Sequence, residues 1–237
     1  MIALAFSGGK DSWACLWLNK DKLKDLTVLW INTGKNYPEM LATIDRAKAI
    51  CPNFVEIKVD RDGQNAVNGI PSDVVPVNWT AYGQMFTGEK STKVQSYLQC
   101  CIENIGKNLH DYCKTFGFTH LIRGQRNDEA HKSISRHGDI VDGITYLHPI
   151  ENWTKQEVLE FVAKHMDIPE HFRFMHSSMD CYDCTAYRAE SKDRIEYAKL
   201  NHPMLHAQYA AREAALNAAL SETLYAYSFL MVDYGGL

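Results

Sequence analysis

The sequence predicts an α/β fold: a parallel sheet of about five strands with helices on both faces, followed by a C-terminal helical tail. Three observations predict it. Short apolar segments alternate along the chain with longer segments of helical periodicity. The connections are short, as where right-handed crossover helices join parallel strands. The composition, 46% hydrophobic and 23% charged over 237 residues, provides enough apolar mass for one sizeable core.

The N-terminal part reads as strand, helix, strand, helix, strand. Each expected strand is a short run of mainly apolar residues, as in a strand that is buried on both faces. Pro38 falls in the first turn of the second helix, where its missing N–H is tolerated. The expected strands are 2–6, 26–32 and 54–60, and the expected helices between them are 11–20 and 37–50.

The middle of the chain is less regular. Residues 61–90 are rich in Gly, Asn, Pro and Ser and predict a long excursion from the sheet. The elements expected after it are a helix over about 92–115, strands over 119–124 and 145–150, and a loop with a weak hairpin over 125–143.

A further helix is predicted to begin after Thr154. Glu157 follows it three residues later, and this spacing forms a capping box, in which each side chain bonds the backbone of the other residue. Pro169 is expected to end this helix.

The C-terminal part predicts one long helix. Its apolar residues at helical spacing are Leu205, Tyr209, Leu216, Leu220 and Leu224. They indicate a packing helix, with a contact between copies of the chain, and so a homo-oligomer, as the alternative. We therefore expect an α/β domain over 1–190 and a helical extension over 191–237 that packs on it or on a partner subunit.

Charge and cysteine content exclude several classes. The formal net charge of −4 gives no global basic signal for nucleic acid or an anionic membrane, although Lys192, Arg194 and Lys199 on a solvated helical face could touch a nucleic acid backbone. The sequence contains no run of 18 apolar residues, so we expect no membrane-spanning helix. Seven cysteines in a chain of this length are no disulfide scaffold and indicate a reducing, cytoplasmic location.

The segment "FSGGKDS" joins the first strand to the first helix. Glycines there allow close approach of backbone N–H groups to a phosphate, and the helix N-terminus adds partial positive charge. Ser7 and Ser12 can donate hydroxyl hydrogen bonds, and Lys10 adds a cation. The glycine spacing differs from the Walker and dinucleotide-binding patterns. A plain strand-to-helix turn is the alternative.

This turn resembles the PP-loop of the adenine nucleotide α-hydrolase superfamily, whose members bind ATP and in many cases cleave it to AMP and pyrophosphate. The segment "INTGKNYPEM", residues 31–40, is similar to a segment of the phosphosulfate reductase branch, with Asn32 in place of an aspartate. The resemblance implies a Rossmann-like fold and nucleotide contacts from Asn32, Thr33 and Gly34.

Two further segments carry the same resemblance, which extends over about residues 1 to 190. "RGQRNDEAHKSISR", residues 123–136, implies contacts to phosphate or sulfate from Gly124, Arg126 and Arg136, since guanidinium groups fork onto such oxyanions. "HPIENWTKQEVLEFV" resembles the segment that follows in that branch.

Two cysteine pairs form a second constellation. Cys100 and Cys101 are adjacent, Cys181 and Cys184 form C-x-x-C, and 79 residues lie between Cys101 and Cys181. Four thiolates suit zinc or an iron–sulfur cluster, and adjacent ligands suit the separated irons of a cubane better. The spacing resembles the 4Fe–4S signature of iron–sulfur adenylyl-sulfate reductases. Four structural cysteines are the remaining alternative.

The other three cysteines, Cys15, Cys51 and Cys113, are expected to be small core residues.

The chain departs from the reductases in two ways. No cysteine follows Cys184, whereas those enzymes carry a nucleophilic cysteine near the C-terminus. The phosphate turn is complete, as in members that bind ATP, whereas the reductases usually carry a degenerate one. The mixture resembles iron–sulfur PP-loop proteins that adenylate an oxygen and replace it with sulfur.

We therefore expect an enzyme that cleaves ATP to adenylate a substrate, with a 4Fe–4S cluster and Mg²⁺ as cofactors. The acceptor is not identified by the sequence and ranges from nucleic acid to sulfate or a small metabolite. A reductase of adenylyl sulfate or phosphoadenylyl sulfate, and a non-catalytic nucleotide-binding iron–sulfur sensor, are the alternatives.

The expected catalytic residues are Lys10, Asp11 and Arg126. The expected nucleotide-binding residues are Ser7, Gly8, Gly9, Lys10, Asp11, Ser12, Asn32, Thr33, Gly34, Gly124, Arg126 and Arg136. The expected cluster ligands are Cys100, Cys101, Cys181 and Cys184.

Overall fold

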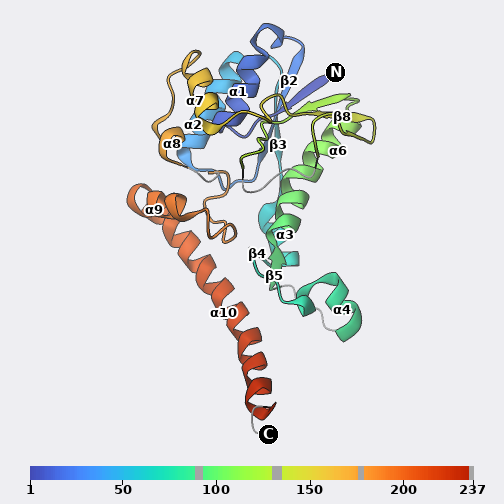
Figure 1. The fold of residues 1–237 in the computed structure, drawn as a ribbon, viewed down its shortest axis with the longest axis vertical. Coiled ribbons are helices and arrows are strands. Elements are labelled where there is room, and N and C mark those ends of the chain that lie inside the picture. The colour runs from blue at the N-terminus through green and yellow to red at the C-terminus, as the bar shows by residue number, and fades with distance from the viewer. Residues whose placement is uncertain (89–92, 130–134, 176–178, 235–237) are drawn as a thin grey trace. The chain divides into compact units, whose positions relative to one another are not determined.

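The computed structural model describes residues 1–88, 93–129, 135–175 and 179–234; within these ranges it leaves out the side chains of Ala81, Thr87, Thr223, Leu224 and 226–234 (Figure 1). Contacts divide the chain into two compact units. Unit 1 comprises Met1–Val59 and Ile105–Cys181, and unit 2 comprises Asp60–Asn104 and Tyr182–Leu237. The division at residue 190 expected from the sequence stays a prediction.

Unit 1 is built on a six-stranded sheet in the order β3-β2-β1-β6-β8-β7. Its strands are β1 (Ile2–Ala5), β2 (Leu26–Asn32), β3 (Phe54–Lys58), β6 (His120–Ile122), β7 (Ile140–Val141) and β8 (Ile144–Leu147). All neighbours are parallel except β7, which pairs antiparallel with β8. This confirms the predicted parallel sheet. The hairpin expected within 125–143 is instead formed by β7 and the last parallel strand, β8, and residues 130–134 lie outside the described part of the chain.

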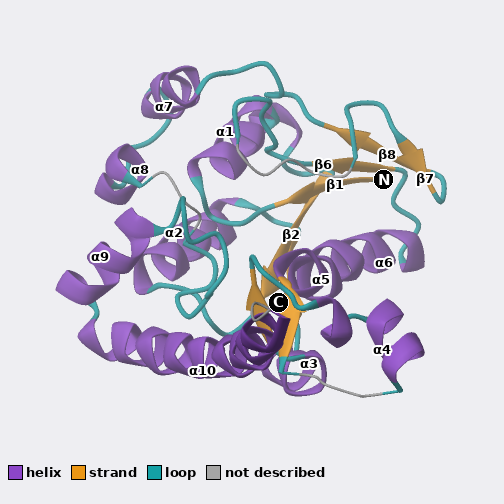
Figure 2. Cartoon of the chain, turned by 60° about the horizontal axis from the view of Figure 1, so that its bottom comes forward, coloured by secondary structure: helices purple, strands orange, loops and turns teal. Residues whose placement is uncertain are grey.

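Helices cover both faces of this sheet (Figure 2). Successive strand residues point to opposite faces, so Leu4 of β1 joins one core and its neighbour Ala3 joins the other. The first core packs under α1 (Lys10–Leu18), α2 (Pro38–Ile50) and α7 (Lys155–Ala163), and the second packs under α6 (Lys107–Thr115). The predicted α/β class, with helices on both faces, is confirmed.

The sequence placed one helix start well. Thr154 accepts a hydrogen bond from the backbone N–H of Glu157, whose carboxylate accepts one from the backbone N–H of Thr154, and α7 begins at the next residue. The expected end at Pro169 was wrong. The helix ends at Ala163, where the last turn tightens as Lys164 N–H bonds Phe161 O. Pro169 instead precedes α8 (Glu170–Phe174).

Unit 2 contains a small parallel sheet of two strands, β4 (Ile70–Ser72) and β5 (Val94–Ser96). The helix expected from about residue 92 therefore begins later, with α5 (Tyr97–Cys101), and continues through a π-helical turn at Ile102–Gly106 into α6. The other helices of unit 2 are α3 (Arg61–Asn68), α4 (Ala81–Thr87), α9 (Lys192–Asn201) and α10 (Pro203–Tyr234).

The long C-terminal helix α10 carries part of the core of unit 2. Leu216 and Ala219 pack with Val94 of β5, while Leu220 and Ile70 lie at the edge of this cluster. Leu224 lies outside the described side chains. The predicted packing role is confirmed for Leu216. No helix in the described part of the chain is long and apolar enough to cross a membrane.

Candidate functional site

The phosphate turn follows β1 at the point where the sheet order reverses. Strands β2 and β3 lie on one side of β1, and β6 and β8 lie on the other. In such sheets a ligand binds outside the carboxyl ends of the two strands at the reversal, here β1 and β6. Residues 7–9 leave β1, and residues 123–126 leave β6. The segments predicted to bind nucleotide therefore start from neighbouring strand ends.

Gly8 has a backbone conformation that requires glycine. Its φ is +83°, and a Cβ there would lie 2.7 Å from Oγ1 of Thr43. The Thr43 hydroxyl donates to the Gly8 carbonyl at 3.0 Å, so α2 holds the turn from behind. The sequence predicted the glycine but not Thr43, whose only signal is a hydroxyl on the buried face of α2.

Gly124 is required for another reason. A Cβ at this position would lie 2.8 Å from the backbone carbonyl carbon and oxygen of Asp11 and 3.0 Å from the nitrogen of Ser12. The chain leaving β6 thus touches the first turn of α1, and only a residue without a side chain fits.

The hydroxyls of Ser7 and Ser12 form hydrogen bonds with the backbone of the turn itself. Ser12 is buried, and its Oγ donates to the carbonyl of Gly9 at 2.8 Å. Ser7 Oγ accepts from the N–H of Gly9 at 3.4 Å. Within the described residues no side chain caps α1, so its first N–H groups have no side-chain acceptor in place and point out of the helix end. An anion is the partner that such a helix end favours.

Lys10, Asp11 and Arg126, the three residues predicted to be catalytic, form one ion-pair system. Lys10 Nζ lies 2.7 Å from Asp11 Oδ2, and Arg126 Nε lies 2.8 Å from Asp11 Oδ1. The side chain of Arg126 is only 6% exposed, so the pair is screened little by solvent. Asp11 therefore holds two cations beside the turn.

Two more carboxylates approach Arg126, and the sequence had not singled them out. Asp128 lies 3.0 Å and Glu129 lies 3.6 Å from its terminal nitrogens. Burial and the nearby charge of Asp11 raise the pKa of Glu129. Both acids stand in the quoted segment, two and three positions after Arg126, so this spacing was the available signal.

The segment after β2 forms a tight turn at the same edge. The side-chain oxygen of Asn32 accepts from the N–H of Gly34 at 2.8 Å, and its amide donates to Glu56. Gly34 has φ +72° and is exposed. Thr33 is buried, and its Oγ1 lies 3.8 Å from the Cys181 sulfur. One of the four predicted cluster ligands therefore lies beside a predicted nucleotide-binding residue.

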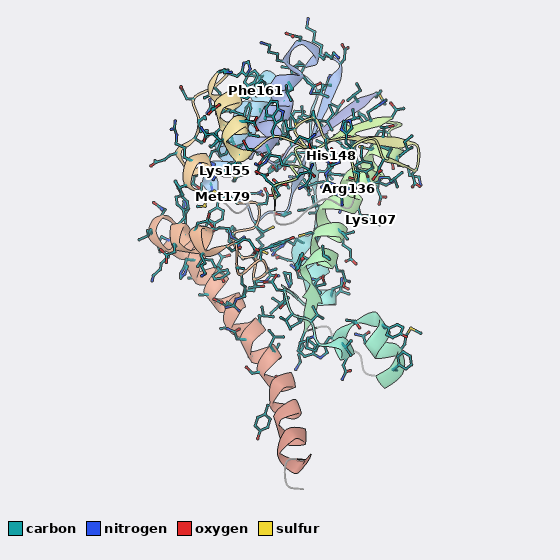
Figure 3. The ribbon with its side chains drawn as sticks, viewed as in Figure 1. Lys107, Arg136, His148, Lys155, Phe161 and Met179 are labelled. Atoms are coloured by element: carbon teal, nitrogen blue, oxygen red, sulfur yellow. The ribbon has the colours of Figure 1, made fainter. Side chains whose placement is uncertain are left out.

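Arg136 is exposed and lies near the β7–β8 hairpin rather than in the ion-pair system around Asp11. Its backbone N–H donates to Asp139 at 2.6 Å, and the adjacent His137 accepts from the N–H of His148 at 3.0 Å. Figure 3 labels Arg136 and His148. Its predicted contact with nucleotide stays a prediction, because residues 130–134 lie outside the described part of the chain.

The other three predicted cluster ligands belong to unit 2. Cys100 and Cys101 lie at the end of α5, and Cys184 follows in the C-x-x-C segment. The sulfur of Cys101 lies 3.6 Å from the hydroxyl of Tyr187. Burial raises the pKa of the Cys100 thiol, while Arg61 opposes this shift and Cys184 adds to it.

In the part of the chain that the structure describes, no group of three or more His, Cys, Asp or Glu side chains is placed to hold a metal ion. All seven cysteines are free thiols. Thiolates are ligands for soft metals, so the four cysteines have the right chemistry, although the described structure does not group them around one point.

The remaining cysteines behave as expected. Cys15, Cys51 and Cys113 are at most 4% exposed and pack in the two cores of unit 1.

The expectation that Arg194 lies on a solvated face was wrong. This side chain is buried and donates to the carbonyl of Cys184 at 3.0 Å and to Ser191 Oγ at 3.1 Å. Its neighbours Lys192 and Lys199 are exposed as expected.

Comparisons with known proteins address the family and the fold. The family model described as phosphoadenosine phosphosulfate reductase domain matches residues 1–187. The crystal structure of phosphoadenylyl-sulfate reductase from Candida auris in a phosphate complex has a TM-score of 0.51 at 14% identity, covering 78% of this chain and 82% of that chain.

Two other solved structures are also similar. NMN synthetase from Francisella tularensis has a TM-score of 0.46 at 12% identity, covering 92% of this chain and 84% of that chain. A predicted subunit of tRNA methyltransferase from Methanocaldococcus jannaschii has a TM-score of 0.39 at 17% identity, covering 84% of this chain and 86% of that chain. A search of curated proteins finds no match.

Proposed function

The chain belongs to the phosphoadenosine phosphosulfate reductase domain family, and from this premise we propose that it cleaves ATP to AMP and pyrophosphate in order to adenylate a substrate oxygen. The observation that carries the proposal is the glycine turn at the point where the strand order of the sheet reverses. In the described part of the chain, no side chain caps the N-terminus of α1 there, and Lys10 and Arg126 lie beside it. Such a place favours a ligand with several phosphates.

In the proposed reaction an acceptor oxygen attacks the α-phosphorus and the bond to the bridging oxygen breaks. Pyrophosphate leaves with the electron pair of that bond, so negative charge grows on it. The first N–H groups of α1 and the cation of Lys10 would bind this growing charge, and fixed donors stabilise it without reorganisation. Arg126 would bind phosphate oxygens with its planar fork.

We assign Asp11 the task of orienting Lys10 and Arg126. Its two carboxylate oxygens each face one of these cations in the structure, which leaves the phosphate oxygens as the natural ligands of Mg²⁺. When bound, Mg²⁺ neutralises charge on the leaving group. Glu129, whose pKa is raised by burial, adds less negative charge to the site than an exposed carboxylate would.

We further propose that the activated oxygen is replaced by sulfur, with AMP as the second leaving group. Cys100, Cys101, Cys181 and Cys184 would hold a 4Fe–4S cluster, which supplies a site for carrying sulfur. The short distance between Thr33 and Cys181 supports a role near the nucleotide edge of the sheet. The acceptor is proposed only as a molecule with an oxygen that can be adenylated, whether nucleic acid, sulfate or a small metabolite.

The test is product analysis with α-labelled ATP on anaerobically purified protein. With water as the acceptor oxygen in this assay, we expect AMP and pyrophosphate in equal amounts. Lys10→Met should lower their release by about a hundredfold. Lys20→Met, which removes an exposed lysine after α1, should leave it unchanged. Absence of both nucleotide binding and AMP would overturn the proposal, whereas binding without products would indicate a sensor.

A reductase of adenylyl sulfate or phosphoadenylyl sulfate is the second candidate. The family match favours it. In this sequence, however, no cysteine follows Cys184 to attack the substrate sulfur. Release of sulfite from adenylyl sulfate and an added thiol would favour this candidate over ATP cleavage.

A further inference from the structure

Asn32, at the end of β2, is held by a carboxylate from the neighbouring strand β3. Its amide nitrogen donates to Glu56 Oε1 at 2.8 Å. The two strands are parallel, and their register places Glu56 opposite Trp30, two residues before Asn32. Opposite residues, and residues two apart along a strand, point to the same face of a sheet, so the two side chains meet on one face. Asn32 and Glu56 both belong to unit 1.

The second oxygen of Glu56 binds a cation from α2. Lys48 Nζ lies 3.3 Å from Glu56 Oε2. The same ammonium lies 5.0 Å from the ring centre of Trp30 and 5.8 Å from that of Phe54, within the range of cation–π attraction. The hydrogen bond from Asn32 lowers the pKa of Glu56, and Lys48 lowers it further, so the carboxylate is ionised at neutral pH. Both of its oxygens therefore act as acceptors.

The carboxylate determines the orientation of the Asn32 amide. An ionised carboxylate accepts hydrogen bonds and donates none, so Asn32 must turn its NH2 group toward Glu56. The amide oxygen of Asn32 is then free to accept from the N–H of Gly34, at 2.8 Å, and this bond closes the turn after β2. The reversed amide would lose both hydrogen bonds. Glu56 thus selects one of the two orientations of the amide.

The turn that this amide closes follows the carboxyl end of β2. Thr33 Oγ1 accepts from the N–H of Lys35 at 3.4 Å, so a second bond of the same kind overlaps the first. Gly34 is exposed at the tip and has φ +72°. Apart from its chain neighbours, no described atom lies within 4 Å of the place where a Cβ of Gly34 would stand. A ligand can therefore reach the backbone at this tip.

We propose that Glu56 is a positioning residue of the nucleotide site: it fixes the Asn32 amide, and through it the turn at Thr33 and Gly34 that contacts the nucleotide. The inference rests on the proposed binding of ATP. It assigns Asn32 a role within the protein, because its amide oxygen and amide nitrogen both have partners there. Lys48 supports the same arrangement from α2 by holding the second oxygen of Glu56.

The first experiment measures KM and kcat for ATP cleavage, and the dissociation constant of ATP with Mg²⁺ by calorimetry, on the whole chain purified anaerobically. Glu56→Met removes the acceptor and keeps a side chain of similar length. It should raise KM and the dissociation constant about tenfold and leave kcat within about twofold, because the turn binds the nucleotide equally before and during the reaction.

The matched control is Glu160→Met. Glu160 also accepts from a side-chain amide, that of Gln156 at 2.8 Å, but on the exposed surface of α7. The dissociation constant of ATP should be unchanged in this variant.

Exchange of the amide and the carboxylate gives a sharper test. Asn32→Asp places two carboxylates against each other and should weaken ATP binding at least about tenfold. Adding Glu56→Gln restores one amide and one carboxylate with the hydrogen bond reversed, and the carboxylate at position 32 can still accept from Gly34. The double variant should therefore recover most of the wild-type affinity. Urea unfolding of each variant confirms that folded protein is compared.

The outcomes separate the two proposals. Wild-type protein that does not bind ATP would overturn the proposed function and this inference with it. Wild-type affinity in Glu56→Met would overturn the inference alone. A defect in Asn32→Asp that Glu56→Gln does not relieve would also overturn it, because the Asn32 amide would then contact the nucleotide directly. If Glu56→Met does not fold, the exchange of amide and carboxylate decides in the same way.

Discussion

Arg126 Nε lies 2.8 Å from Asp11 Oδ1, and this ion pair joins the chain leaving β6 to the first turn of α1. The guanidinium and the carboxylate come from the two strand ends at which the sheet order reverses. The pair therefore fixes the geometry of the proposed nucleotide site before any ligand arrives.

Replacing Arg126 by Lys should lower release of AMP at least tenfold. Lysine keeps the charge, but its single ammonium cannot face Asp11, Asp128 and Glu129 together, so the site loses its fixed geometry. Single-turnover assays with labelled ATP would measure the effect. Wild-type rates in Arg126→Lys would contradict the assigned role.

Gly124→Ala should destabilise the protein by about 1–3 kcal/mol and weaken ATP binding, because the new methyl group meets backbone atoms of Asp11 that cannot move away. The control is Gly106→Ala. There the added Cβ meets nothing within 4 Å and φ is −61°, so the variant should gain about 0.5–1 kcal/mol. Urea unfolding and binding isotherms measure both. Equal stability of the two variants would contradict the close approach.

Glu129→Gln should become more stable relative to wild type as the pH rises. Burial raises the pKa of Glu129 above its ordinary 4.5, so the folded state favours the protonated carboxyl. Its contribution is fully present below the ordinary pKa and is lost as pH rises through the raised pKa. Glutamine imitates the neutral form at every pH. Unfolding free energies between about pH 4 and about pH 8 would test this, and a difference that does not vary with pH would contradict it.

Thr154→Ala should lower stability by about 1 kcal/mol and leave AMP release unchanged, because the capping box at α7 serves only the helix. The exposed neighbour Gln156→Ala should stay within about 0.5 kcal/mol of wild type. Thermal unfolding and the product assay check the two expectations. A loss of activity without loss of stability would assign α7 a role that the structure does not indicate.

The central sheet was predictable because its strands are buried on both faces, which leaves continuous apolar runs in the sequence. The pair β4–β5 was not predictable. Each strand has three residues, one contains Pro71, and the pairing joins segments that are distant in sequence. Local pattern favoured a helix over Val94–Ser96, and the parallel neighbour overrode it.

The candidate site also contains features that the sequence predicts and features that it does not. The glycine turn has a local signature and was found from the sequence. Thr43 gains its importance from the Gly8 carbonyl, a neighbour that only the fold supplies, whereas the position of Glu129 three residues after Arg126 was visible in the sequence. Arg194 was wrongly expected to be solvated. Helical spacing indicates which residues share a face but not what covers that face, and in the structure Arg194 donates to the carbonyl of Cys184.

The place of β1 in the middle of the sheet has a consequence for synthesis on the ribosome. Its first neighbour, β2, follows soon in the chain, but its other neighbour, β6, begins at His120, and the N–H of Thr119 bonds the carbonyl of Met1. A nascent chain that ends before this point exposes one open edge of β1. The turn at Gly8 therefore matures late, when Gly124 and Arg126 have left the exit tunnel, and loop closure over this distance slows folding.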